Sequence, residues 1–202
     1  MRVYLIRHGQ TTSDVEEKYN GWYDDHLTNK GKLQASELAK KLSEKLIEKV
    51  FVSPRIRTIE TALIIAKELP VKFDVVNEFG ERNSYGVLTG LTKKEALEKF
   101  PDEVEELEAN KPYQKVKDCE DYYDFAQKVI SKFNEMIENE FFMETQGLAI
   151  ITHGATISTI FREVLGFEIN GIKDCAIFEL EFDGDGYEIL YAKDVLEMIA
   201  DN

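Results

Sequence analysis

Two kinds of hydrophobic pattern alternate along the chain, one typical of buried strands and one typical of amphipathic helices. Short aliphatic or β-branched runs predict strands at residues 3–6, 50–52, 71–76, 148–151, 176–182 and 187–191. Apolar residues at helical spacing predict helices at 28–47, 58–69, 93–100, 102–110, 120–142 and 155–165. This order, with helices between most of the strands, is the pattern of a sheet covered by helices on both faces.

Two of the predicted helices have clear apolar faces. The helix at 28–47 begins at Thr28, which can cap its first turn, and carries Leu33, Leu38, Leu42 and Leu46 at helical spacing. The helix at 120–142 carries a second apolar face made of Phe125, Val129, Phe133 and Ile137. Both faces are wide enough to pack against a sheet.

The alternation of elements predicts an α/β fold, a three-layer αβα sandwich whose sheet is mostly parallel. The turn Asp183-Gly184-Asp185-Gly186 joins the last two strands as a β-hairpin, which adds an antiparallel strand. A length of 202 residues suits a single domain, 1–202, with a small cap-like insertion at about 78–118.

Composition narrows the class of partner. The chain is 43% hydrophobic and 32% charged, and its formal net charge is -14. Such a charge argues against nucleic acid or an anionic membrane, since both attract clustered lysine and arginine. No apolar stretch could span a bilayer and no signal peptide precedes the first strand, so we expect a cytoplasmic protein. Cys119 and Cys175 are then expected to be free thiols.

Cationic side chains stand where three of the predicted strands end. Arg7 and His8 follow the first strand, Arg57 lies after the second, and His153 follows the strand at 148–151. In open α/β sheets ligands bind outside the carboxyl ends of the strands, so these side chains are predicted to build one pocket. A cationic pocket in an otherwise acidic protein predicts a phosphate-bearing ligand.

Each of these residues also has an ordinary structural interpretation. Arginine–histidine pairs are common on surfaces, and a single histidine after a strand is more often held by structural hydrogen bonds than catalytic. The combination favours function, because the chain has only three histidines and two of them, His8 and His153, precede a glycine at equivalent junctions.

The same segments resemble a known family. Arg7-His8-Gly9-Gln10-Thr11 resembles the signature of the histidine phosphatase superfamily, whose members have the phosphoglycerate-mutase-like fold. Further segments resemble motifs of that family in the same order: 20–28 with Gly31, 53–62, 81–93, 120–129 and 152–154. Together they cover most of the chain, so the resemblance implies both the fold and the chemistry of the family.

The resemblance implies a phosphate-transferring site built from the strand ends. His8 matches the nucleophile that forms a phosphohistidine, and Arg7 and Arg57 match the arginines that hold the phosphate. His153 matches a further contact to the same group. No metal is implied, and no cofactor except 2,3-bisphosphoglycerate if the protein is a mutase.

Other matches concern the general acid and the substrate. Glu81 matches the general acid, although its loop carries one extra residue and Glu78 is the alternative. Gly21, Gly154 and Lys93 match positions that contact the phosphate or the substrate.

Two departures from the family pattern bear on the prediction, the first on the activity and the second on the site residues. Family mutases carry an adjacent arginine pair that grips the substrate, and residues 103–110 contain no arginine. Asp14 replaces a family asparagine and would repel a dianion, so Asp14 stays outside the predicted catalytic set.

We therefore predict a phosphomonoester hydrolase that acts on a small phosphorylated metabolite through a phosphohistidine. Cofactor-dependent phosphoglycerate mutase is the alternative, and a catalytically silent binding domain is a less favoured one. The oligomeric state stays open, a homo-oligomer included, and so does the identity of the metabolite.

Overall fold

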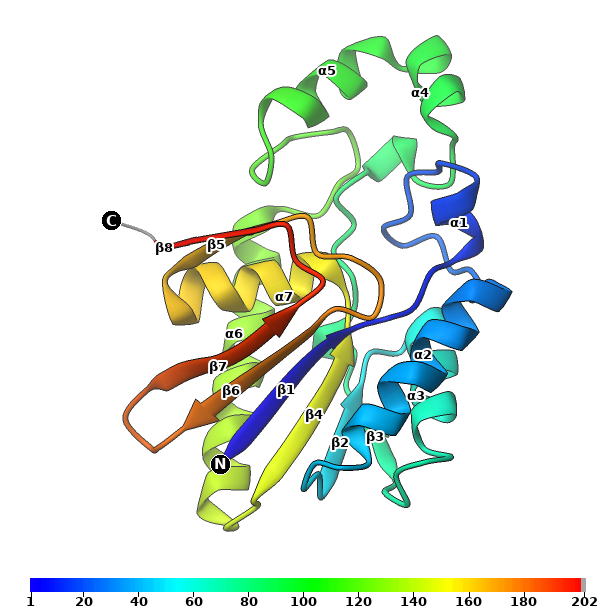
Figure 1. Ribbon diagram of the computed structural model, residues 1–202. Helices are drawn as coiled ribbons and strands as arrows, with labels where there is room; N and C mark the ends of the chain where they lie inside the picture. Colours follow the sequence, from blue (N-terminus) through cyan, green and yellow to red (C-terminus); the bar gives the residue numbers. More distant parts are fainter. Residues whose placement is uncertain (201–202) are drawn as a thin grey trace.

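Six strands form the central sheet of the computed structural model, which describes residues 1–200 (Figure 1). Their order across the sheet is β3-β2-β4-β1-β6-β7. The strands are β1 (Arg2–Arg7), β2 (Lys49–Val52), β3 (Phe73–Val75), β4 (Gly147–Thr152), β6 (Ile177–Phe182) and β7 (Tyr187–Lys193). β1 to β4 run parallel, and β6 and β7 form an antiparallel hairpin beside β1. The predicted mostly parallel sheet with an antiparallel addition is confirmed.

Helices cover both faces of this sheet (Figure 1). They are α2 (Asn29–Leu42) and α3 (Ile56–Ile65) on one face, and α6 (Tyr122–Phe142) and α7 (Gly154–Ile160) on the other. Alternate residues of β1 enter the two cores: Val3 and Leu5 pack with α6 and α7, whereas Tyr4 and Ile6 pack with α2 and α3. α7 continues as one π-helical turn, Phe161–Leu165. The predicted three-layer αβα sandwich is confirmed.

A further group of elements stands beyond the carboxyl ends of the parallel strands (Figure 1). It contains α1 (Thr12–Val15), α4 (Lys93–Lys99), α5 (Pro101–Ala109) and the 3-10 turn η2 (Gly86–Leu88). Their own small hydrophobic cluster consists of Tyr19, Leu88, Ala96, Leu107 and Val116. All of these residues but Tyr19 belong to segment 78–118, here called the cap, and they pack with one another and not in the two cores of the sandwich. Phe79, near the start of the cap, instead belongs to the core that contains α6 and α7.

The first long helix is shorter than predicted and packs through different residues. It ends at Leu42 instead of continuing to residue 47, and Leu33 and Leu46 are 66% and 64% exposed. The predicted leucine face is therefore wrong at both ends. Gly31, Ala35 and Ala39 take its place beside Leu38 and Leu42, since small residues let the helix approach the sheet closely.

The sequence did not predict α1 or a second, two-stranded sheet of β5 (Phe167–Asn170) and β8 (Glu197–Ala200). α1 is a single turn held by a capping box between Thr11 and Asp14. Every residue of β8 is exposed, so the strand lacks the alternation of buried and exposed positions by which strands are recognised.

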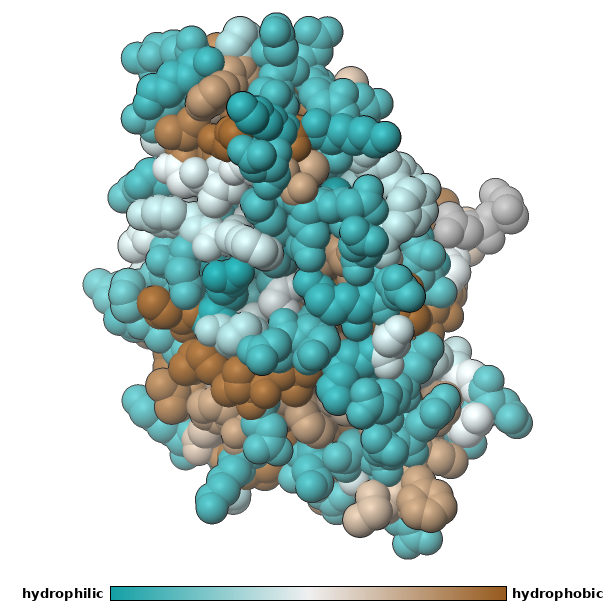
Figure 2. All heavy atoms as spheres, turned by 180° about the vertical axis from the view of Figure 1, so that it is seen from behind, coloured by the Kyte–Doolittle hydropathy of each residue, from teal (hydrophilic) through white to brown (hydrophobic). Residues whose placement is uncertain are grey.

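The surface of the rear face is mostly hydrophilic (Figure 2). Hydrophobic side chains gather there in a band across the body below the cap, with a smaller group on the cap itself. Within residues 1–200 no helix combines the length and the apolar character needed to cross a bilayer. Cys119 and Cys175 are both free.

Backbone contact between α2 and the loop after β1 fixes the position of that loop. A Cβ atom on Gly31 would lie 2.1 Å from Gln10 O, and one on Gly9 would lie 2.6 Å from Gly31 O. Both distances are shorter than van der Waals contact allows. The two glycines therefore permit α2 to pack directly on the segment that follows His8.

We expect Gly31→Ala to lower the free energy of unfolding by about 2 kcal/mol or more, because a backbone must move to admit the new methyl group. The sign is informative, since alanine is ordinarily preferred to glycine in a helix by about 1 kcal/mol. Lys32→Ala, at an exposed neighbouring position, should stay within about 0.5 kcal/mol of wild type. Urea unfolding gives the free energy of unfolding of wild type and both variants. A Gly31→Ala variant as stable as wild type would contradict the close contact.

Candidate active site

The parallel pairing of β1 with β4 brings two histidines side by side. Arg7 pairs with Thr152, and each strand is followed at once by its histidine. The backbone N–H of His8 donates to Thr152 O at 3.1 Å, and the ring centroids of His8 and His153 lie 5.2 Å apart. His8 is 2% exposed and His153 is fully buried. The structure therefore brings these two predicted site residues into one buried cluster.

Hydrogen bonds assign the two ring nitrogens of His8. Nδ1 lies 2.8 Å from Gly9 O, which can only accept, so Nδ1 carries the proton. Nε2 accepts from Arg57 Nε at 3.2 Å and is therefore unprotonated, with its electron pair directed at that N–H. Burial, and then the charges of Arg7 and Arg57, hold the pKa of His8 well below its usual value. His8 is thus a neutral imidazole whose Nε2 is unprotonated.

Arg57 is held by backbone carbonyls of the loop that follows α1. It lies in the first turn of α3, and its Nη1 and Nη2 donate to Tyr23 O at 2.9 Å and to Gly21 O at 3.0 Å. Gly21 has a φ of 47°, a left-handed conformation that suits glycine. Asp25 is buried 3.6 Å from Nη1 and balances the charge. Gly21 therefore takes part in the site through its carbonyl, which accepts a hydrogen bond from Arg57.

His153 is oriented by a residue that the sequence analysis did not single out. Ser53 Oγ, at the end of β2, lies 2.6 Å from His153 Nε2, and both residues are fully buried. Burial and the charge of Arg57 hold the pKa of His153 well below its usual value. A hydroxyl that donates to Nε2 leaves the ring proton on Nδ1, which has no partner. The only sequence signal for Ser53 was its place in the same segment as Arg57.

Glu81 is the acidic residue beside the histidines. Its Oε2 lies 4.0 Å from His153 Nδ1, and its Oε1 accepts from the Arg82 N–H at 3.0 Å. Burial raises the pKa of Glu81, and Arg57 opposes that shift. The alternative, Glu78, is half-buried in the 3-10 turn η1 (Asn77–Phe79), and no ion pair joins it to His8 or His153 in the described chain. The geometry therefore favours Glu81 over Glu78.

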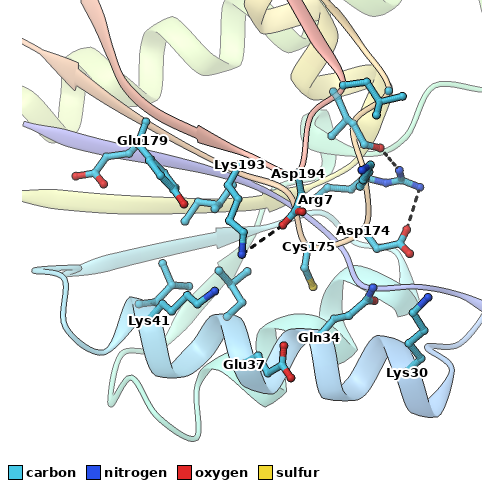
Figure 3. Close-up of a pocket in the computed structure, with 18 of the residues that line it drawn as sticks. Arg7, Lys30, Gln34, Glu37, Lys41, Asp174, Cys175, Glu179, Lys193 and Asp194 are labelled. Atoms are coloured by element: carbon cyan, nitrogen blue, oxygen red, sulfur yellow. Dashed lines mark hydrogen bonds and ion pairs between the residues drawn. The ribbon is translucent and has the colours of Figure 1, made fainter.

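Arg7 reaches the cluster from β1 but is shared with other groups. Its Nη1 donates to Ile172 O, and its Nη2 lies 3.6 Å from Asp174 (Figure 3). The same Nη2 lies 3.8 Å from Asp14. Asp14 also accepts from the N–H and hydroxyl of Thr11, both at 2.8 Å. Asp14 is thus paired with a cation, and the cation is Arg7.

The remaining predicted residues lie at the two sides of the site. Gly154 begins α7 directly after His153, and a Cβ atom there would meet nothing within 4 Å. Lys93 is the first residue of α4 in the cap and is exposed. Within residues 1–200 no hydrogen bond or ion pair links the Lys93 side chain to the histidine cluster, so the structure does not bring it to the site.

The cluster contains buried N–H groups that lack an acceptor. Arg7 Nε and His153 Nδ1 are buried without a hydrogen-bond partner. A buried donor that stays unpaired costs about 1–3 kcal/mol, so an anion with several oxygens is the kind of ligand that such groups stabilise. A phosphoryl group supplies those oxygens, and His8 Nε2 supplies an electron pair for its phosphorus atom.

Of two proteins with similar sequences, one is named a mutase and the other a phosphatase. A 2,3-bisphosphoglycerate-dependent phosphoglycerate mutase of Novosphingobium aromaticivorans is 40% identical over 107 residues, 50% of this chain and 46% of that protein. An uncharacterised phosphatase of Bacillus subtilis, PhoE, is 27% identical over 164 residues, 81% of this chain and 77% of that protein. The chain thus matches only about half of the mutase's length.

A solved structure and a family comparison agree on the fold. A phosphoglycerate mutase from Bacillus anthracis superposes with a TM-score of 0.76 at 21% identity, covering 94% of this chain and 91% of that one. This likeness establishes the phosphoglycerate-mutase-like fold that the sequence implied. The sequence model of the histidine phosphatase superfamily (branch 1) matches residues 3–195 of this chain. The chain therefore belongs to the histidine phosphatase superfamily, branch 1.

Proposed function

We propose that the protein hydrolyses a small phosphomonoester through a phosphohistidine intermediate on His8. The observation that carries the proposal is the pairing of an unprotonated, buried His8 Nε2 with two unpartnered buried donors, Arg7 Nε and His153 Nδ1. A ligand that accepts from both donors while its central atom meets Nε2 is a phosphoryl group.

The proposed reaction has two steps. In the first, His8 Nε2 attacks phosphorus, the bond from phosphorus to the substrate oxygen breaks, and Glu81 gives its proton to that oxygen. In the second, the Glu81 carboxylate takes a proton from water, the water oxygen attacks phosphorus, and the phosphorus–nitrogen bond breaks. Arg7, Arg57 and His153 hold the charge on the phosphoryl oxygens in both steps. The proposed reaction uses no metal ion and takes place in the cytoplasm.

Hydrolysis is favoured over transfer to a second hydroxyl by the composition of the cap. Residues 103–110 contain no arginine that could grip a phosphoglycerate, and α5 carries five acidic side chains, Asp102, Glu103, Glu105, Glu106 and Glu108. Water is then the available acceptor of the phosphoryl group. The mutase remains the alternative, and only in that case would 2,3-bisphosphoglycerate be a cofactor.

His8→Ala should abolish turnover of 4-nitrophenyl phosphate, because no other residue has an unprotonated ring nitrogen in the same place. The chain supplies a matched control in His26→Ala, since His26 is 67% exposed and paired with Glu60. That variant should keep wild-type activity. Rapid-quench labelling should find acid-labile phosphate on wild type and on His26→Ala only. Label on His8→Ala would show that His153 is the nucleophile instead.

Glu81→Gln should lower kcat/KM for an alkyl phosphate by about 10²–10⁴-fold, because that leaving oxygen needs a proton. The loss should be much smaller with 4-nitrophenyl phosphate, whose leaving group departs as an anion. The protonated form of Glu81 is required, so wild-type kcat/KM should fall as pH rises through its raised pKa. Glu78→Gln is the matched control, and a larger effect there would reassign the acid.

Incubation with 3-phosphoglycerate distinguishes hydrolysis from transfer. We expect the phosphoenzyme to decay to free phosphate without added 2,3-bisphosphoglycerate, because residues 103–110 of the cap lack the adjacent arginine pair of the mutases. Scoring free phosphate and 2-phosphoglycerate together decides the question. A strict need for the bisphosphate, with isomerised product and little phosphate, would establish the mutase.

A further inference from the structure

Arg7 borders a cavity of about 870 Å³ between α2 and the segment that leads into β6 (Figure 3). Its lining includes Arg7, Asp14, Gln34, Asp174 and Cys175, and neither His8 nor His153 belongs to it. The Arg7 guanidinium therefore stands between the histidine cluster and a solvent-filled space on its other side. The contacts that hold the guanidinium in this position determine which of its N–H groups points toward the histidine cluster.

Residues 171–175 engage both terminal nitrogens of Arg7. Nη1 donates to Ile172 O, and Nη2 lies 3.6 Å from Asp174 Oδ1. Figure 3 shows the Asp174 carboxylate turned toward the guanidinium, with both contacts drawn. Nε is the one guanidinium nitrogen that is buried without a partner. The N–H of Nε is therefore the group of Arg7 that remains for an anion.

The loop that carries Asp174 is tied to the same strand end as His8. The Cys175 N–H donates to His8 O, and the Arg7 N–H donates to Ala176 O, both at 3.0 Å. Cys175 has a φ of 53°, a left-handed conformation that turns the chain tightly before β6. Backbone contacts thus fix Asp174 relative to both Arg7 and His8.

We propose that Asp174 is a positioning residue for anion binding. Its carboxylate holds Nη2 of Arg7 while Ile172 O holds Nη1, so that Nε is presented to the phosphate at His8. The inference rests on the proposed function, because it takes Arg7 and His8 to act on a phosphoryl group. Asp174 itself does not touch the phosphate. An arginine whose orientation is already fixed binds an anion more tightly, since no rotamer freedom is lost on binding.

Several charged and polar groups face Asp174 and set the pH at which it is ionised. They are Arg7 from β1, Asp14 from α1, and Lys30 and Gln34 from α2, with Cys175 next in the chain. Burial and Asp14 raise the pKa of Asp174, and Arg7, Gln34 and Lys30 oppose the shift without cancelling it. Asp174 therefore loses its charge at a higher pH than an ordinary aspartate as the solution is acidified, and its hold on Arg7 weakens with it.

Sulfate is a suitable probe because it stays a dianion from about pH 4 to pH 8 and is not turned over. Isothermal titration calorimetry on the full chain should show sulfate binding about tenfold more weakly to Asp174→Asn than to wild type at pH 7.5. Asp194→Asn is the matched control, because Asp194 lines the same cavity but pairs with Lys193 at 3.7 Å. Its dissociation constant should equal that of wild type.

The pH dependence separates positioning from a general structural role. The ratio of the two dissociation constants, Asp174→Asn over wild type, should fall as the pH is lowered from 8 to 4, because a protonated Asp174 resembles asparagine. A ratio that stays constant from pH 8 to pH 4 would overturn the proposal. So would an unchanged dissociation constant at pH 7.5, or a tighter one, which would mean that Asp174 competes with the anion for Arg7.

The positioning role and the proposed function fail in different ways. Sulfate binding needs no turnover, so an active wild type with no effect of Asp174→Asn overturns the positioning role alone. A wild type that neither binds sulfate nor hydrolyses 4-nitrophenyl phosphate overturns both.

Discussion

The site depends on the parallel register between β1 and β4, in which Arg7 lies opposite Thr152. Both strands end at the same height, so the residues that follow them, His8 and His153, leave the sheet together. The neighbouring β2 is parallel to β4 and ends one residue before Ser53, which reaches His153. A shift of one residue in this register would turn the alternating core residues of β1 to the wrong faces and separate the histidines.

Burial gives the cluster its chemical character. Two histidines and Arg57 lie almost entirely out of water, and burial is the largest cause of the low pKa values of both histidines. The arginines add to that effect, so the imidazoles stay neutral while the cations stay charged. The carbonyls of Gly21 and Tyr23 and the carboxylate of Asp25 keep Arg57 in place. Neutral nucleophile and fixed cations are the combination that phosphoryl transfer to nitrogen requires.

Much of the fold could be predicted from periodicity, because the sheet is built from short apolar runs and α6 from a regular apolar face. The ends of α2 could not, because Gly31, Ala35 and Ala39 pack closely without a strong hydrophobic signal. Strand-end histidines and arginines indicated the site, but contacts between distant segments, such as Ser53 with His153 or Asp174 with Arg7, leave no local pattern. For the same reason Asp14 and Arg7 could each be singled out by sequence, while their pairing could be found only in the structure.

The central claim is that His8 acts as a neutral nucleophile through Nε2, because Gly9 O holds the proton on Nδ1. The most direct measurement is ³¹P NMR of the phosphorylated protein, trapped during turnover and denatured in alkali, in which phosphohistidine survives. Phosphorus bonded to Nε2 and phosphorus bonded to Nδ1 give separate resonances, and peptide mapping assigns the histidine. The account predicts a single phosphohistidine, phosphorylated on Nε2 of His8. Phosphorus on Nδ1, or on His153, would contradict it.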